Sequence, residues 1–278
     1  MTCRRHAWGA VLLGLLALNA QGQEKSWAEP RTGMVFVALP KACFQMGTSA
    51  PVPASGLAWE RMGFKSNLSA DEVPQHEVCL GAFWMARHEV RWSDWQTVMG
   101  AGEVGADGSR PVTGVSWEQA RAFAERLSAL AGTPQLFRLP TEAQWEYACR
   151  AGRKEASDPP RPEVFNTAWY SGGMRSMAAP APVSTLKPNA WGLFDLLGNV
   201  WEWTQDGYRA DAYARHGLFN PVIAALELQR VIRGGSHRSE ENQVRCGNRA
   251  FYAQDEALPQ IGFRLVLIRE PEKKKGVN

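Results

Sequence analysis

The periodic segments of this chain are short, and this feature limits its possible folds more than any other. Only residues 116–132, SWEQARAFAERLSALAG, keep a helical spacing of apolar side chains over several turns. A Ser or Thr followed three positions later by Gln opens this segment, and the same capping pattern predicts shorter helices over 93–100 and 141–152. Few long helices, few long strands and much loop predict a single irregular α+β domain.

Strand-like segments alternate with stretches that are rich in Pro, Gly and Ser. Residues 34–39 (MVFVAL), 230–236 (RVIRGGS) and 262–268 (GFRLVLI) are predicted strands, and residues 76–90 form a strand or a hairpin. Residues 48–72 and 153–191 lack periodicity and are predicted loops. No internal repeat and no linker divides the chain into two cores.

The first 22 residues have the pattern of a secretory signal peptide. Arg4 and Arg5 precede a short apolar run, and small residues follow it. We expect cleavage near residues 21–23 and a periplasmic location; an uncleaved anchor is the alternative. Residues 269–278 are a charged tail that we expect to be solvated.

Charge and cysteine content exclude some classes of protein. The net charge of +3 gives no electrostatic support for nucleic-acid binding. Outside the predicted leader the cysteines number four, and in an exported protein an even number favours disulfides. Four cysteines allow three pairings, and spacing does not choose among them.

Several motifs occur in a defined order: FQMGT, PVTGVSWEQARAFAERL, FRLPTEAQWEYACRAG, NAWGLFDLLGNVWEW, RVIRGGS and GFRLV. Together they resemble the formylglycine-generating enzyme family, also called sulfatase-modifying factors, from about residue 33 to about residue 268. The resemblance implies one compact domain with little regular secondary structure, related to C-type-lectin-like folds.

The stretch GLFDLLGNVWEWTQD, residues 192–206, places two acids around a turn. Ca²⁺ prefers carboxylate and carbonyl oxygens, six or more in number. The resemblance implies a structural calcium site formed by the side chains of Asp195 and Glu202 and the carbonyls of Gly198 and Val200. Without the resemblance, a solvent-exposed turn that carries two acids explains the same residues.

A second calcium site of the family is only half represented. Asn166 and Thr167 resemble its first part, but the stretch SGGMRSMAAPAP at 171–182 supplies no acid. The resemblance also selects the cysteine pairs. Cys149 and Cys246 match positions that are paired in the family, which leaves Cys43 with Cys79.

The catalytic thiols of the family are missing. Authentic members oxidise a substrate cysteine with O₂, using two cysteines after RGGS that bind copper as thiolates. Here the first position is Ser239, and the second has no counterpart. Soft thiolates are the ligands for Cu(I). We therefore expect no copper and no sulfatase-activating activity.

The predicted pocket residues are Ser236, His237, Glu240 and Trp201. His237 could act as a general base, or as a metal ligand with Glu240 or Glu241; a purely structural histidine and a solvated loop are the alternatives. Trp201 and Trp203 alternate along the chain, so one of them is expected to line an aromatic cleft.

Two functions from different classes follow from the resemblance. The first is an oxidative tailoring enzyme, such as the periplasmic protein that matures the chromophore of the siderophore pyoverdine. The second is a non-catalytic periplasmic regulator that promotes activation of a type VI secretion threonine kinase. A binder of sugars or peptides ranks third. The expected partner is a small or peptide-like ligand in the first case and a periplasmic or membrane protein in the second.

Overall fold

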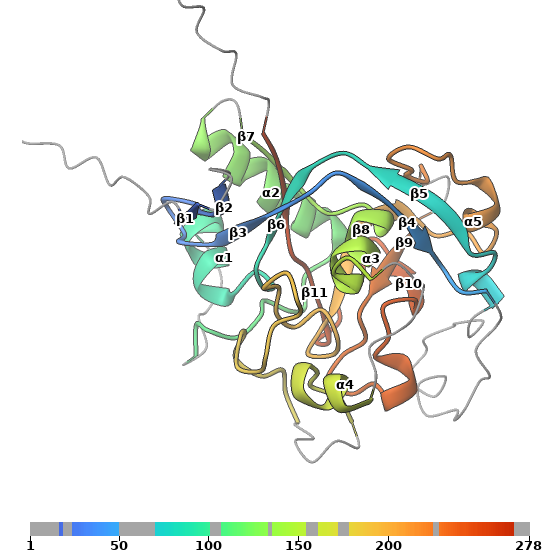
Figure 1. Ribbon diagram of the computed structural model, residues 1–278. Coiled ribbons are helices and arrows are strands. Elements are labelled where there is room, and N and C mark those ends of the chain that lie inside the picture. The colour runs from blue at the N-terminus through green and yellow to red at the C-terminus, as the bar shows by residue number, and fades with distance from the viewer. Residues whose placement is uncertain are drawn as a thin grey trace, which may run out of the picture.

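The computed structural model describes residues 17–18, 24–49, 70–100, 107–132, 135–153, 161–171, 178–224 and 228–269 (Figure 1). The largest sheet has six strands in the order β1-β2-β3-β6-β12-β7, and a second has four in the order β10-β9-β8-β11. β4 and β5 form a separate ribbon. The predicted mixed α+β domain is confirmed.

The strands are short, as expected. Those of the six-stranded sheet are β1 (Ala17–Leu18), β2 (Glu24–Ala28), β3 (Val35–Leu39), β6 (Phe83–Ala86), β12 (Val266–Arg269) and β7 (Gln135–Arg138). Those of the other sheets are β10 (Arg249–Ala253), β9 (Gln229–Arg233), β8 (Trp201–Gly207), β11 (Ile261–Gly262), β4 (Ala42–Met46) and β5 (His76–Leu80).

The predicted leader and tail fall mostly outside the described residues. Within the leader, β1 pairs antiparallel with β2 at the edge of the largest sheet. None of the described helices is long and apolar enough to cross a bilayer.

Three helices begin and end close to the predicted positions. α2 (Trp117–Ala131) and α3 (Glu142–Arg150) have the predicted capping boxes at Ser116 and Thr141. α1 (Trp92–Met99) ends at Gly100 as expected, but its cap is Arg91, not Ser93. The reason is Asp94, whose buried carboxylate accepts from the Arg91 backbone N–H at 2.9 Å.

Two expectations about secondary structure were wrong. Residues 76–90 do not form a hairpin, because β5 pairs with β4 while β6 pairs with β3 and β12. The predicted loop 153–191 contains α4 (Arg161–Thr167). Short helices also occur as η2 (Ala70–Glu72), α5 (Ala212–Arg215) and η3 (Glu241–Gln243).

Both disulfides have the pairing that the resemblance implied. Cys43 and Cys79 are register partners across β4 and β5. Cys149, on α3, is bonded to Cys246, which lies between η3 and β10. The second bond joins positions 97 residues apart, and the covalent loop that it closes contains the turn at 195–202.

Candidate functional site

The turn at 195–202 has an unusual backbone that the packing around it enforces. Asp195 and Asn199 adopt left-handed conformations, with φ of 55° and 57°. Gly198 has φ of 77°, and a Cβ there would lie 2.0 Å from the carbonyl oxygen of Trp169. Only glycine fits such a close approach, so the Gly-Asn pair serves the shape of the turn.

Both carboxylate oxygens of Glu202 have protein partners. Arg264 donates to both of its carboxylate oxygens, at 2.7 and 2.6 Å, and Trp145 Nε1 donates at 2.8 Å. This arrangement fixes β8 against α3 and the segment before β12. The structure thus places a predicted calcium ligand in a buried ion pair with Arg264.

Asp195 is buried as well, but only half of its carboxylate is satisfied. One oxygen accepts from the Ser184 backbone N–H at 2.7 Å, and Oδ1 has no hydrogen-bond partner among the described residues. Burial raises the pKa of Asp195 to about 6, and Glu202 adds to the rise. The Ser184 hydrogen bond and the charge of Arg264 act in the opposite direction and favour the ionised carboxylate.

Glu89 is a second half-satisfied carboxylate, and the sequence analysis missed it. Asn199 donates to one oxygen at 3.1 Å, while Oε2 has no partner among the described residues. Burial raises the pKa of Glu89 well above its usual range, and the neighbouring Asp195 adds to the rise. Glu89 lies in a strand-like HEV stretch with no local sign of a site.

These residues fit a hard divalent cation. Asp195 and Glu89 each have one carboxylate oxygen without a partner among the described residues, and the two groups interact through their charges. No cluster of three or more His, Cys, Asp or Glu placed to hold a metal occurs in the described ranges. A cation here would need further oxygens, and Ca²⁺ is an ion that accepts carboxylate and carbonyl oxygens together.

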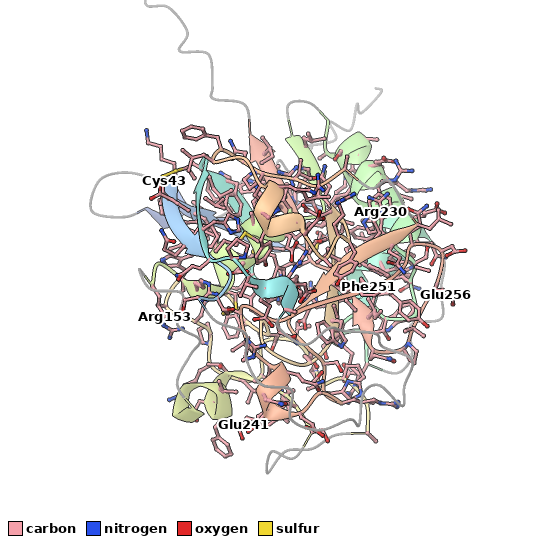
Figure 2. The ribbon with its side chains drawn as sticks, turned by 90° about the vertical axis from the view of Figure 1, so that its right-hand side faces the viewer. Cys43, Arg153, Arg230, Glu241, Phe251 and Glu256 are labelled. Carbon is pink, nitrogen blue, oxygen red and sulfur yellow. A yellow bond between two sulfur atoms is a disulfide. The ribbon has the colours of Figure 1, made fainter. Side chains whose placement is uncertain are left out.

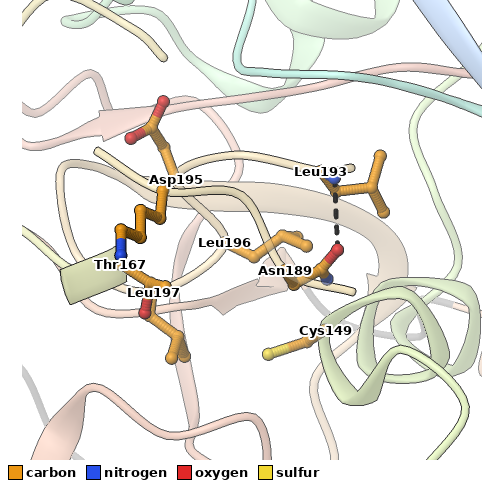
Figure 3. Close-up of a pocket in the computed structure, with 8 residues that line it drawn as sticks. Cys149, Thr167, Asn189, Leu193, Asp195, Leu196 and Leu197 are labelled. Atoms are coloured by element: carbon orange, nitrogen blue, oxygen red, sulfur yellow. Dashed lines mark hydrogen bonds between the residues drawn. The ribbon is translucent and has the colours of Figure 1, made fainter. Parts of the chain in front are cut away.

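Asp195 also lines a small pocket (Figure 3). Asp195 and the disulfide residue Cys149 lie on opposite sides of it, and Asn189 accepts from the Leu193 backbone N–H at 3.1 Å. Thr167 and Lys187 also line it. Lys187 brings a positive charge beside Thr167, which resembles part of the family's second calcium site, a site that the sequence only half represents.

The Gly-Gly-Ser loop is joined directly to this turn. The Gly198 N–H donates to the Gly234 carbonyl at 2.8 Å, and the His237 N–H donates to the Asn199 carbonyl at 2.8 Å. Ser236 N–H donates to Ser239 Oγ at 3.0 Å. The structure therefore brings the predicted calcium turn and the predicted catalytic loop together.

His237 is buried, and only one of its ring nitrogens has a partner. Its Nδ1 lies 3.0 Å from the Asn199 carbonyl oxygen, which can only accept, so Nδ1 carries the proton of the neutral ring. Nε2 is buried and has no hydrogen-bond partner among the described residues. Burial lowers the pKa of His237.

Glu240 is the N-cap of η3, where its backbone N–H donates to Gln243 Oε1 at 2.8 Å and its carbonyl accepts from the Gln243 N–H at 3.0 Å. Figure 2 shows Glu241 on η3, at the opposite end of this face from Cys43. Ser239, at the position of the missing thiol, is buried, and its carbonyl accepts from Ser171 N–H at 2.7 Å.

The two indoles of the WEW stretch do not divide between cleft and interior. Trp201 and Trp203 belong to the same buried cluster. Trp203 Nε1 donates to the Val115 carbonyl at 3.0 Å. The alternation argument assumed one open face, but β8 is covered on both.

Many charged residues of the other motifs form a buried network of ion pairs. Arg233 pairs with Glu142 and Glu146 at 3.0 and 2.6 Å, and Arg249 pairs with Glu142 at 2.6 Å. Arg150 also pairs with Glu146, at 2.8 Å. The RLPTEAQWEYACR and RVIRGGS motifs therefore tie α3 to β9 and β10.

The fold and the site define an irregular α+β domain in which a carboxylate-bearing turn supports a Gly-Gly-Ser loop. Residues 23–269 match the family described as sulfatase-modifying factor enzyme 1-like domain. The chain belongs to this formylglycine-generating enzyme-like family.

Individual relatives are consistent with this assignment. A formylglycine-generating enzyme of Thermomonospora curvata is 33% identical over 242 residues, which cover 80% of this chain and 76% of that protein. The mouse enzyme is 31% identical over 68% of this chain, but the match spans only 52% of the mouse protein. The chain thus corresponds to about half of the mouse relative.

A solved structure and a protein kinase are also similar to this chain. The solved structure of PvdO from Pseudomonas aeruginosa has a TM-score of 0.73, with 23% identity, 87% of this chain and 97% of that chain covered. At that identity the likeness shows the fold. The serine/threonine-protein kinase pkn1 of Chlamydia pneumoniae is 29% identical over 70% of this chain and 34% of that protein.

Proposed function

We propose that this chain is an exported oxidative tailoring enzyme that does not generate formylglycine. The observation that carries the proposal is the Gly-Gly-Ser loop, where Ser239 replaces the thiol and a buried His237 adjoins it. The other nearby cysteine, Cys246, is held in a disulfide. The fold likeness to PvdO supports maturation of a pyoverdine-type siderophore chromophore in the periplasm.

In this proposal the reaction is a two-electron oxidation of a dihydro-aromatic precursor. A carbon–hydrogen bond and the adjacent carbon–hydrogen or nitrogen–hydrogen bond of the precursor break, and a carbon–carbon or carbon–nitrogen double bond forms. Molecular oxygen accepts the two electrons and the two protons and leaves as hydrogen peroxide. His237 accepts the first proton at Nε2, which has no hydrogen-bond partner among the described residues, and passes it to the reduced oxygen.

We also propose that one structural Ca²⁺ supports the loop. Asp195 and Glu89 would bind it with the carbonyls of Gly198 and Val200, and Glu202 would contribute through its charge while it remains paired with Arg264. The ion would fix the turn that holds His237 through Asn199.

A regulatory function is the second candidate. The similarity to a protein kinase shows that related sequence occurs within signalling proteins. Leu218 and Phe219 are 42% and 73% exposed, and they offer an apolar contact for a partner. Such a protein would bind the periplasmic part of a type VI secretion kinase and would show no turnover.

The test uses the purified chain with a dihydro-chromophore peptide and, separately, with a sulfatase-derived cysteine peptide. We expect O₂ consumption and growth of the chromophore absorbance with the first, and no aldehyde with the second. His237→Gln should lower turnover by roughly 10²–10⁴-fold, the usual contribution of a general base. Arg121→Gln, on an exposed face of α2, is the matched control and should change nothing.

Aldehyde formation, or equal turnover by wild type and His237→Gln, would contradict the enzyme proposal. Absence of turnover combined with capture of a kinase ectodomain would favour the regulatory function.

A further inference from the structure

Two histidines far apart in the sequence face each other at one end of the molecule. His76 opens β5, and His216 directly follows α5, which lies beside that end of the β4–β5 ribbon (Figure 1). His76 Nε2 lies 3.0 Å from His216 Nδ1. Neither residue belongs to the turn or the loop described above.

The tautomer of His76 is set by its second nitrogen. His76 Nδ1 lies 3.0 Å from the Pro74 carbonyl oxygen, which can only accept. Nδ1 therefore carries the proton, and Nε2 directs its lone pair at His216. An imidazole N–H held by a backbone carbonyl is the usual second-shell arrangement of a metal-binding histidine.

His216 has two neutral forms, and each leaves something unsatisfied. If Nδ1 carries the proton, it donates to His76, but the buried Nε2 lone pair has no donor among the described residues. If Nε2 carries the proton, two lone pairs face each other across 3.0 Å. A cation between the nitrogens makes the second form favourable.

The pair is held in place before any ion arrives. Tyr213, fully buried, lies with its ring centroid 5.0 Å from that of His76 and 5.3 Å from that of His216. The Leu218 carbonyl accepts from Cys79 N–H at 2.7 Å, and the Cys79 carbonyl accepts from Asn220 N–H at 2.9 Å. These bonds fasten the segment after His216 to β5.

We propose that His76 and His216 form a two-imidazole binding site for Cu²⁺ or Ni²⁺. With metal–nitrogen bonds of about 2.0–2.1 Å, nitrogens at this separation subtend roughly 90–95° at the metal. This angle matches neighbouring positions of a tetragonal or square-planar ion, and a tetrahedral ion would require a wider one. Both side chains are half-buried, so solvent reaches the remaining positions.

The experiment uses the full chain after treatment with EDTA. One equivalent of Cu²⁺ is added, and pulsed electron paramagnetic resonance counts the coordinated imidazoles. We expect two in the wild type and no more than one in His76→Gln or His216→Asn. Isothermal titration should show at least a tenfold loss of Cu²⁺ affinity in each variant, and His237→Gln should bind as the wild type does.

Fewer than two imidazoles in the wild-type spectrum would overturn the proposal without any variant. A two-imidazole signal that persists in both variants would overturn it as well. His76 lies at the rim, so His76→Gln serves if His216→Asn does not fold. Melting curves without metal verify that each variant that is compared is folded.

Discussion

At the scale of single residues, Asn199 connects the elements of the candidate site. Its side chain donates to Glu89 and accepts from Ala181 N–H at 2.8 Å, while its backbone carbonyl accepts from His237. Its left-handed φ of 57° is a conformation that Asn tolerates better than most residues. A change at Glu89 is therefore transmitted to His237 through one residue, Asn199.

Removal of calcium should lower the melting temperature of the wild type. An ion at a hundredfold excess over its dissociation constant stabilises by about 2.7 kcal/mol, which corresponds to roughly 5–10 °C in a chain of this size. In Asp195→Asn and Glu89→Gln the difference between calcium and EDTA should nearly vanish. Scanning calorimetry with and without EDTA measures it.

Glu125→Gln is the control, because Glu125 lies in an exposed ion pair on α2. It should respond to EDTA as the wild type does. If EDTA shifts no melting curve in the series, the turn binds no ion.

At the scale of elements, α3 departs from the pattern of a surface helix. All nine residues from Glu142 to Arg150 are buried, although Glu142, Gln144, Glu146 and Arg150 are polar. Arginines from β9 and β10 satisfy two of these acids. α3 is thus fixed by charge on one face, by packing on another and by the disulfide near its end.

The two disulfides should differ in their contribution to stability. Replacing Cys149 and Cys246 by Ala should cost about 4–5 kcal/mol of unfolding free energy in the chain-entropy account. Replacing Cys43 and Cys79 should cost about 1 kcal/mol less, because that bond closes 36 residues rather than 97. Urea unfolding of the two double variants measures both values. A larger loss for the Cys43–Cys79 pair would contradict the entropic explanation.

Local chemistry made some elements predictable and others not. The capping boxes at Ser116 and Thr141 are contained within four residues, so α2 and α3 were predicted. The split of residues 76–90 between two sheets depends on distant partners, and no local signal contains it. Glu89 could not be assigned for the same reason, since its partner Asn199 is 110 positions away.

At the scale of the whole molecule, the buried ion network sets the response to acid. Glu146 is fully buried, and Arg150 and Arg233 lower its pKa to about 2 against the opposing effect of burial. A lowered acid pKa contributes stability above the unfolded value near 4.5, and this contribution is lost as the pH falls toward 2.

Unfolding free energy should therefore decline below about pH 4.5, and Glu146 alone should account for about 3 kcal/mol of the decline. Glu146→Gln should flatten this acid limb and lower stability at neutral pH by about 3–5 kcal/mol, because buried arginines lose their partner. Urea titrations from pH 7 to pH 2 measure both effects.

Asp211 provides the comparison for this test. Hydrogen bonds from Arg209 and Arg215 also lower its pKa to about 2, but it lies on the surface. Asp211→Asn should leave the acid limb nearly unchanged, since exposed ion pairs contribute little. If the unfolding free energy of Glu146→Gln declined with falling pH as steeply as that of the wild type, the network would not be the origin of the acid response.

The position of β12 has a consequence for when the protein can fold. β12 pairs with β6 on one side and with β7 on the other, so it fills the interior of the largest sheet. Its residues are synthesised after every other described strand. Before β12 is synthesised, no strand is available to pair with both β6 and β7. The largest sheet is therefore completed only after residues 266–269 leave the ribosome, so a chain that is stopped before them cannot close its core.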